Sequence, residues 1–257
     1  MTAGFSYASL ATKGARAAQE DACDFAPHGG GAGGGLLAVL ADGMGGHAGG
    51  ALASTVACRR FLAAYADSHG AARLRLAGAL DAANRALAEA VLADRSLVGM
   101  GCTLVGATFE TSNDGPVLTW VSVGDSPLLL FRQSRLYQLN ENHSLAPILD
   151  ALAEAGELTA AEASNHPRRH FLRSALTGSG IELVDLPDTL TPLAPGDWVI
   201  AASDGLETLP HAEIADILAF NNDASPQSIA EALITSVETA GEANQDNATV
   251  MAVRVVG

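Results

Sequence analysis

Short apolar runs, mostly of Val, Leu, Ile and Ala, recur along the chain between polar and glycine-rich segments. They predict strands at 36–41, 102–109, 117–123, 128–132, 198–202 and 249–256. Because several of these runs are apolar at nearly every position, we expect both faces of each strand to be covered, by helices or by a second sheet.

Longer segments between the strands carry helical patterns. Segments 51–66 and 74–92 are rich in Ala and Leu at helical spacing, which predicts two long helices. A third helix is predicted at 145–155, with Ser144 as its N-cap and Gly156 just after its end.

Two further helices are indicated by their ends. Thr159 and Glu162 are spaced as a capping box, which predicts a helix start. Ser225 followed by Pro226 predicts another start, and Gly241 the end of that helix.

The order of these elements decides the fold class. Strands and helices come in mixed clusters without strict alternation, and segment 117–132 is typical of a hairpin around Gly124-Asp125-Ser126. The glycine-rich stretch 29–35 is interpreted as another hairpin loop. The chain is therefore predicted to be an α+β protein with antiparallel sheets packed between helices, folded as one domain over 1–257.

Composition excludes several classes of protein. The 257 residues carry a formal net charge of −15, which disfavours binding to nucleic acid and to anionic membranes. Three cysteines without a CxxC pair argue against a disulfide framework or a structural zinc site. No leader or membrane-spanning segment is predicted, so we expect a cytoplasmic monomer.

Aspartates occur repeatedly where apolar strands end or begin. Asp42, Asp125, Asp204 and Asp246 all lie at such positions, and Asp21 lies upstream. Each alone is typical of a turn, but several carboxylates at one sheet edge repel one another unless cations compensate them. Oxygen ligands favour Mg²⁺ or Mn²⁺, and the Gly43 carbonyl is a candidate additional ligand.

Six short motifs, in order, resemble those of bacterial phosphatases of the PP2C (PPM) family. They are Arg16-Ala17-Ala18-Gln19-Glu20-Asp21, Asp42-Gly43-Met44-Gly45-Gly46, Gly101-Cys102-Thr103, Gly124-Asp125-Ser126, Ser203-Asp204-Gly205-Leu206 and Asp246-Asn247-Ala248-Thr249. The resemblance covers essentially the whole chain. It implies a four-layer α-β-β-α sandwich with two central antiparallel sheets flanked by helices.

The resemblance also implies a set of site residues. Asp42 would bridge two Mn²⁺ or Mg²⁺ ions, with Asp204 and Asp246 on one ion and the Gly43 carbonyl on the other. Asp21 and Glu20 would act through waters.

A third, weaker ion would lie between Asp125 and Asp204. Arg16 would hold the substrate phosphate beside the catalytic aspartates 42, 204 and 246, and segment 147–169 would form a flap. Four positions depart from the family pattern. Pro127 follows Gly-Asp-Ser where Arg is common, and Met44 replaces a His that is a proposed general acid in many eukaryotic members. Gln19 replaces the usual Asn and Cys102 the usual Thr, and both changes are tolerable.

The implied activity is hydrolysis of phosphoserine and phosphothreonine in proteins by a hydroxide shared between two cations. The substrates would be signalling proteins modified by a Ser/Thr kinase. Alternatives are a regulatory pseudo-phosphatase that binds a partner, an acidic cation-binding module, and a phosphatase of small esters. Minor hypotheses make His47 an acid or a metal ligand and give substrate contacts to His143, His166 and the pair Arg168-Arg169. For each of them a structural or solvated role is the favoured interpretation.

Overall fold

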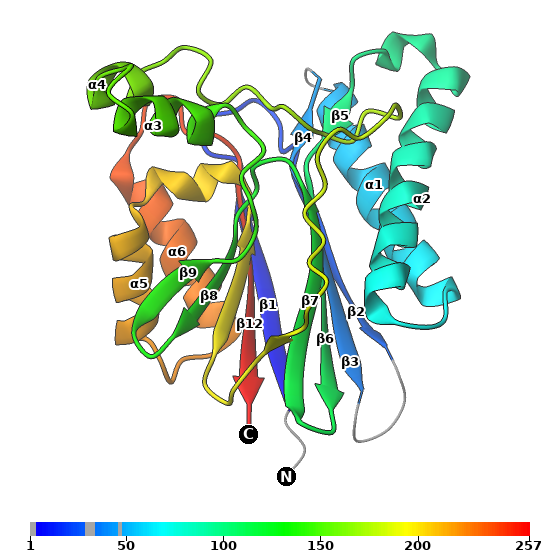
Figure 1. Cartoon of the computed structure of the whole chain (residues 1–257), viewed down its shortest axis with the longest axis vertical. Helices are drawn as coiled ribbons and strands as arrows, with labels where there is room; N and C mark the ends of the chain where they lie inside the picture. Colours follow the sequence, from blue (N-terminus) through cyan, green and yellow to red (C-terminus); the bar gives the residue numbers. More distant parts are fainter. Residues whose placement is uncertain (1–3, 29–33, 46–47) are drawn as a thin grey trace.

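Two five-stranded antiparallel sheets lie face to face at the centre of the molecule (Figure 1). The computed structural model describes residues 4–28, 34–45 and 48–257. The first sheet has the order β1-β12-β11-β8-β9, with β1 Gly4–Thr12, β8 Leu128–Arg132, β9 Arg135–Gln138, β11 Trp198–Ala202 and β12 Ala248–Val256. The second has the order β10-β7-β6-β3-β2, with β2 Ala22–His28, β3 Gly35–Ala41, β6 Leu104–Ser112, β7 Gly115–Val123 and β10 Thr191–Pro192.

Helices cover the outer face of each sheet (Figure 1). The elements are α1 Ala48–Asp67 and α2 Ala72–Ala93 over the second sheet, α5 His211–Phe220 and α6 Pro226–Ala240 over the first, the short helices α3 Ala146–Glu154 and α4 Ala160–Ser164, and the 3-10 turns η1 Arg95–Leu97 and η2 Asp204–Thr208. The predicted α-β-β-α sandwich is thus confirmed.

Successive side chains of each central strand point to opposite faces of its sheet, and this divides the core into layers. Val39 packs against the helices α1 and α2, whereas Leu40 next to it faces the layer between the sheets. On β11, Ile200 likewise packs towards α5 and α6, whereas Val199 faces the layer between the sheets. Because successive side chains of a strand point to opposite faces, runs that are apolar at every position supply both layers.

The predicted hairpin over 117–132 is wrong. β7 pairs with β6 and β10 in the second sheet, while β8 pairs with β11 and β9 in the first. The chain crosses between the sheets at 124–127, where Gly124 has a φ of +102° and the Pro127 carbonyl accepts a hydrogen bond from the Ala202 N–H. Gly-Asp-Ser is therefore a crossover whose ends join different sheets.

Other predictions need smaller corrections. The strand predicted at 102–109 is interrupted at Thr103, which separates β5 (Gly101–Cys102) from β6; β5 pairs with β4 (Gly43–Met44). The N-cap of α3 is Leu145, and Ser144 instead accepts the Ala146 N–H on its hydroxyl. The remaining caps and helix ends are confirmed, with a capping box at α4, Ser225 capping α6, and Gly156 and Gly241 in the left-handed region.

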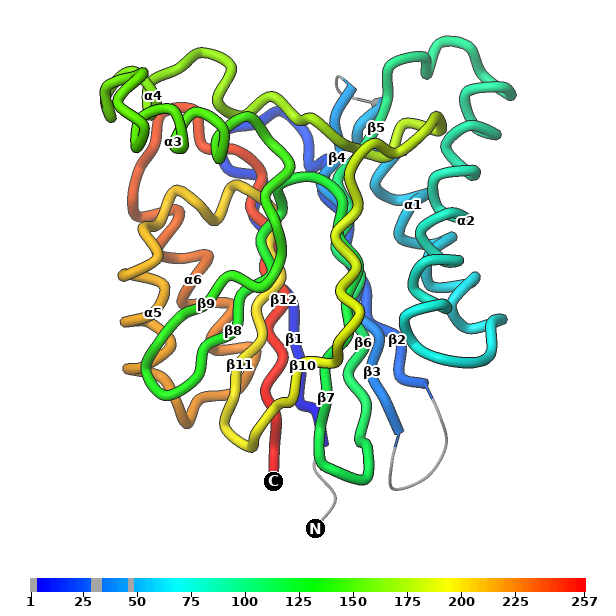
Figure 2. The backbone as a smooth tube through the Cα atoms, in the orientation of Figure 1, coloured from blue at the N-terminus to red at the C-terminus, as the bar shows by residue number. Residues whose placement is uncertain are grey.

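An extended segment at 170–180, here called the strap, crosses the end of the sandwich from α4 towards α2 (Figure 2). Backbone hydrogen bonds join Leu176 to Cys102 of β5 in both directions, at 2.9 and 3.0 Å. The Asn84 side chain of α2 accepts the N–H groups of Thr177 and Gly178. The strap is therefore tied to both the β4–β5 pair and the outer helix.

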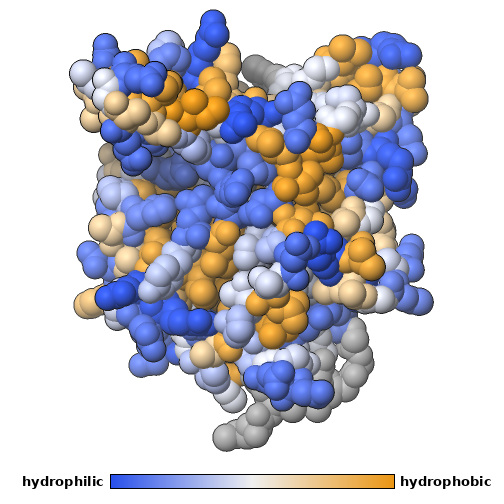
Figure 3. Space-filling model, in the orientation of Figure 1, coloured by the Kyte–Doolittle hydropathy of each residue, from blue (hydrophilic) through white to orange (hydrophobic). Residues whose placement is uncertain are grey.

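The surface around this end of the molecule is mixed. On the face seen in Figure 3, hydrophilic surface lies beside an apolar patch where the strap and the segment after it pass in front of β7. In the ranges that the structure describes, no helix is long and apolar enough to cross a membrane.

Core packing between α1 and β6 predicts a large stability effect. Phe61 is fully buried, and its ring occupies the space that a Cβ at Gly106 would need. Phe61→Ala should lower the free energy of unfolding by about 3–5 kcal/mol, because it leaves a cavity that rigid strands cannot close. Urea unfolding measures the change. Phe220→Ala is the matched control, since Phe220 is 92% exposed; a comparable loss in that variant would contradict the packing argument.

Candidate active site

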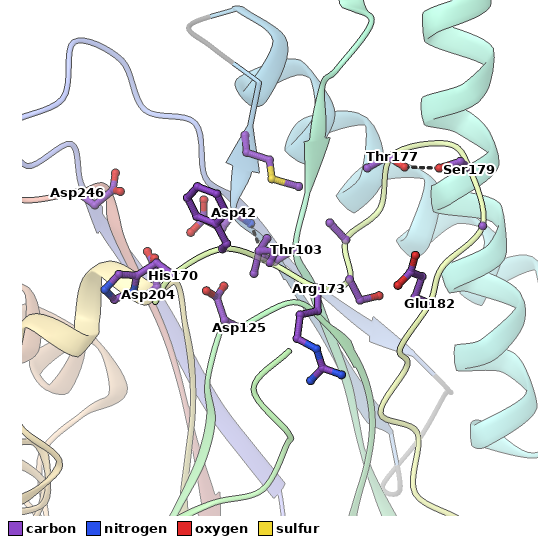
Figure 4. Close-up of a pocket in the computed structure, with 16 residues that line it drawn as sticks. Asp42, Thr103, Asp125, His170, Arg173, Thr177, Ser179, Glu182, Asp204 and Asp246 are labelled. Atoms are coloured by element: carbon purple, nitrogen blue, oxygen red, sulfur yellow. Dashed lines mark hydrogen bonds between the residues drawn. The ribbon is translucent and has the colours of Figure 1, made fainter. Parts of the chain in front are cut away.

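Four aspartates from both sheets meet around one cavity at the end of the sandwich away from the chain termini (Figures 1 and 4). Asp42 follows β3 and Asp125 follows β7 in the second sheet; Asp204 follows β11 and Asp246 precedes β12 in the first. The cavity has a volume of about 590 Å³. The strand-end aspartates predicted from sequence are therefore brought together.

Asp42 is held by Thr103, which lies between β5 and β6. Its N–H donates to the Thr103 hydroxyl at 3.0 Å, and its carbonyl accepts the Thr103 N–H at 2.9 Å. Burial, followed by the charges of Asp204 and Asp21, raises the pKa of Asp42 well above its usual range. Burial, followed by the charge of Asp246, also raises the pKa of Asp204, and a hydrogen bond with Asp42 partly offsets this. The two carboxyls can thus share a proton.

Asp125 is 6% exposed and points into the cavity (Figure 4). The chain at Gly124 passes so close to Thr103 that a Cβ on residue 124 would collide with the Thr103 side chain. Burial, then the charges of Asp204 and Glu207, raises the pKa of Asp125 to about 7. Within the described residues, its own backbone N–H is the only donor to its carboxylate.

Asp21 does not line the cavity, and the hydroxyls of Ser203 and Thr249 hold its carboxylate. Its Oδ2 accepts hydrogen bonds from Ser203 at 2.8 Å and from Thr249 at 2.7 Å. Its Oδ1 is buried and has no hydrogen-bond partner in the part of the chain that the structure describes. Burial is the main reason that its pKa rises to about 6.

Glu20 and Gly43 pack against the beginning of α1. A Cβ on Gly50 would collide with the Glu20 carboxylate, and a Cβ on Gly43 would collide with the carbonyls of Glu20 and Gly50. Glu20 lines a small separate pocket beside Arg16 and does not line the aspartate cavity. A glycine is required at 43, and the Glu20 side chain lies apart from the other carboxylates.

Arg16 forms an ion pair with Asp246 and is 57% exposed. It lines a second cavity of about 610 Å³, together with Glu207 and Glu242. The two cavities share Asp204, Asp246 and His170. A ligand bound at Asp204 and Asp246 would therefore border both cavities.

The chemistry of these donors suits hard cations. The raised pKa values of Asp21 and Asp125, together with the buried Oδ1 of Asp21 that has no hydrogen-bond partner among the described residues, indicate negative charge without compensation. Among the described residues, however, no three His, Cys, Asp or Glu side chains are already grouped to hold one ion. Asp246 is instead paired with Arg16.

The structure shows what most of the histidines and arginines considered as minor candidates contact. His143 is buried and its ring accepts the Gly124 N–H; the ring of His166 accepts the Arg168 N–H. Both rings therefore support the backbone. Arg169 forms two hydrogen bonds with Asp150 of α3 at 2.7 and 2.8 Å, which occupies its guanidinium. His47 lies outside the described residues.

Sequence reasoning missed several residues of the site. Thr103, Ser203 and Thr249 were visible as members of motifs, but nothing in the sequence indicated which carboxylates they support. His170, which lies near Asp204 (Figure 4), belongs to an aperiodic segment. No signal in the sequence places it at the cavity.

Comparisons with known proteins find relatives over most of the chain. A family model described as protein phosphatase 2C matches residues 13–250. The serine/threonine phosphatase stp of Listeria welshimeri is 31% identical over 223 residues, which cover 84% of this chain and 83% of that protein.

Solved structures give the same result. The serine/threonine phosphatase PstP/Ppp of Mycobacterium tuberculosis is 30% identical, with a TM-score of 0.77 over 98% of this chain and 99% of that one. The catalytic domain of PstP in complex with two manganese ions is also 30% identical, with a TM-score of 0.75 over the full length of both chains.

The raised pKa values predict how the stability of the metal-free protein depends on pH. Asp21 and Asp125 titrate at about 6 and about 7 in the folded state, against 3.8 ordinarily. Between these values the folded state binds more protons than the unfolded chain, so stability falls as pH rises through this window. The slope is up to about 1.4 kcal/mol per pH unit for each carboxyl. Thermal unfolding of chelator-treated protein at a series of pH values measures it.

Two variants control this experiment. Asp125→Asn removes one buried carboxyl and should make the slope shallower. Asp81→Asn changes an exposed carboxylate on α2 and should leave it unchanged. Equal slopes in wild type and Asp125→Asn would show that burial of Asp125 does not destabilise the ionised state.

Proposed function

Because this chain belongs to the protein phosphatase 2C family, we propose that its aspartate cavity is the active site of a metal-dependent serine/threonine protein phosphatase. One observation carries the assignment of the site. Aspartates from the ends of four strands, two in each sheet, line a single cavity with too little positive charge to balance them. Divalent cations supply the missing charge, and phosphorylated proteins are the substrates.

Two ions, Mn²⁺ or Mg²⁺, are assigned to this cavity. Asp42 would bridge them, with Asp204 and Asp246 on one ion and the Gly43 carbonyl on the other. Asp21 supports this centre from behind, through its unpartnered Oδ1. Glu20 is the weakest member of the proposed set, because its side chain lies against α1.

When bound, such ions lower the pKa of a shared water and neutralise charge on a phosphate. The protein's own side chains would hold the ions and orient the phosphate. Burial raises the pKa of both Asp42 and Asp204, so protons held by these carboxyls in the metal-free protein would leave when they become ligands. Arg16, next to Asp246, offers a planar fork that fits two oxygens of a phosphate monoester.

A third, weaker ion is proposed between Asp125 and Asp204. The support is that Asp125 is nearly fully buried, faces the cavity and has no side-chain partner among the described residues. Glu207 adds a further carboxylate near both aspartates. Pro127 is buried in the crossover and its carbonyl is bonded to Ala202, so this departure from the family pattern leaves the loop anchored.

Segment 147–169 is proposed to act as a flap within one phosphatase domain spanning 1–257. It contains α3 and α4, and the Asp150–Arg169 pair closes it. The substrates are proposed to be targets of a Ser/Thr kinase. We further propose a cytoplasmic monomer that binds neither nucleic acid nor membranes, in keeping with three free cysteines and a net charge of −15.

Loss of a proposed bridging or shared ligand should strongly reduce turnover. Asp42→Asn and Asp204→Asn should each lower kcat/KM by roughly a thousandfold, because charge stabilisation of the transition state depends on the cations. Phosphate release from a phosphoserine peptide with added Mn²⁺ measures this, with Asp81→Asn as control. Wild-type activity that survives complete chelation would contradict metal dependence.

The third ion can be tested by counting. Equilibrium dialysis should show that Asp125→Asn binds one Mn²⁺ fewer than wild type at saturating concentration, with the tighter ions retained. Asp81→Asn should match wild type. If Asp125→Asn and wild type bind the same number of ions, the proposal of a third site is contradicted.

Arg16 should act on phosphate binding. Arg16→Ala should lower kcat/KM by about a hundredfold, and Arg16→Lys should recover part of this, because an ammonium keeps the charge but not the bidentate geometry. Inhibition by inorganic phosphate should weaken in parallel. Arg95→Ala, a change at an exposed arginine in η1, should leave both values unchanged; unaltered phosphate inhibition in Arg16→Ala would contradict the assigned role.

A further inference from the structure

The aspartate cavity is larger than a phosphate group requires. From the aspartates it extends along the strap to Arg173, Thr177, Ser179 and Glu182 (Figure 4). If the phosphate binds at the aspartates, the remaining space lies beside the phosphorylated residue. The walls of this space therefore contact the neighbouring residues of the substrate.

One part of this wall is apolar. Phe171 of the strap and Met44 of β4 both line the cavity, together with Leu172 and Ala175. Phe171 is 58% exposed, so other side chains of the protein leave much of its ring uncovered. An open aromatic side chain beside a polar reaction centre is well suited to bury an apolar group of a ligand.

The backbone at Phe171 is firmly held. Its N–H donates to the Arg168 carbonyl at 3.0 Å, and its own carbonyl accepts the Leu145 N–H at 3.0 Å. On either side, Arg169 is bonded to Asp150, and the Arg173 N–H donates to the His143 carbonyl at 2.7 Å. The ring is thus presented from a segment with little freedom, which is what a preformed specificity pocket needs.

The Met44 side of the wall is equally constrained. Met44 pairs with Gly101 in the β4–β5 ladder, and a Cβ at Gly101 would lie 3.0 Å from the Met44 Cε and 3.2 Å from the Thr177 Cγ2. Cys102 and Leu176 continue this pairing into the strap. Phe171 and Met44 therefore belong to one hydrogen-bonded wall.

We infer that Phe171 and Met44 form an apolar subsite that selects phosphoproteins with an apolar residue next to the phosphorylated serine or threonine. This inference rests on the proposed function, because it takes the phosphate position from the aspartate site. An apolar neighbour would lose contact with water against this wall. A charged neighbour packed against Phe171 and Met44 would lose its hydration without an opposite charge from these two side chains. The charged lining residues Arg173 and Glu182 lie elsewhere along the cavity.

The test compares two phosphoserine peptides that differ only at the residues flanking phosphoserine, leucine on both sides in one and serine on both sides in the other. With Mn²⁺ present, wild type should show a kcat/KM about tenfold higher for the leucine peptide, mainly through a lower KM. Phe171→Ala should reduce this preference to less than about twofold by raising the KM of the leucine peptide. Phe171→Leu should keep most of it.

Phe220→Ala is the matched control, since this ring is 92% exposed at the end of α5 and lines neither cavity that borders the aspartates. It should retain the wild-type preference. Equal kcat/KM for both peptides in wild type, or an unchanged preference in Phe171→Ala, overturns the subsite and leaves the phosphatase standing. If wild type hydrolyses neither peptide with Mn²⁺, the proposed function fails and the subsite fails with it.

Discussion

Mutual repulsion between buried carboxylates is the constraint on which the rest of this structure depends. Asp42, Asp125 and Asp204 lie close together with raised pKa values, and burial is the first cause for each. Such a cluster destabilises the folded chain unless protons or cations neutralise it. Divalent cations at the proposed site would supply the positive charge that this cluster lacks.

The sandwich brings these groups together through its strand ends. Each sheet contributes two aspartates, so the cavity exists only when the two sheets are stacked in the observed register. Small residues and hydroxyls then set the fine positions. Gly124 allows the crossover to approach Thr103, Thr103 anchors Asp42, and the hydroxyls of Ser203 and Thr249 hold Asp21. The strap completes the cavity from outside the sheets.

Much of this could be predicted from the sequence, and the failures have physical causes. Strands that are apolar throughout, such as β8 and β11, were found with their bounds, and their terminal aspartates indicated the site. The partly exposed strands β1 and β2 were missed because their burial is incomplete and their pattern weak. Segment 117–132 was mistaken for a hairpin because local turn residues do not reveal which sheet each strand joins. Phe171 and His170 lie in a strap positioned by long-range hydrogen bonds, which leave no periodic signal.

The most direct test of the account is calorimetric titration of the metal-free protein with Mn²⁺ at a pH of about 6.5, repeated in buffers of different ionisation enthalpy. Because carboxyls with raised pKa values hold protons at this pH and must release them to become ligands, binding of at least two ions should be accompanied by measurable proton release. Binding without proton release would contradict the coupling between the carboxylate cluster and the cations. No binding to the folded protein at millimolar Mn²⁺ would contradict the metal site itself.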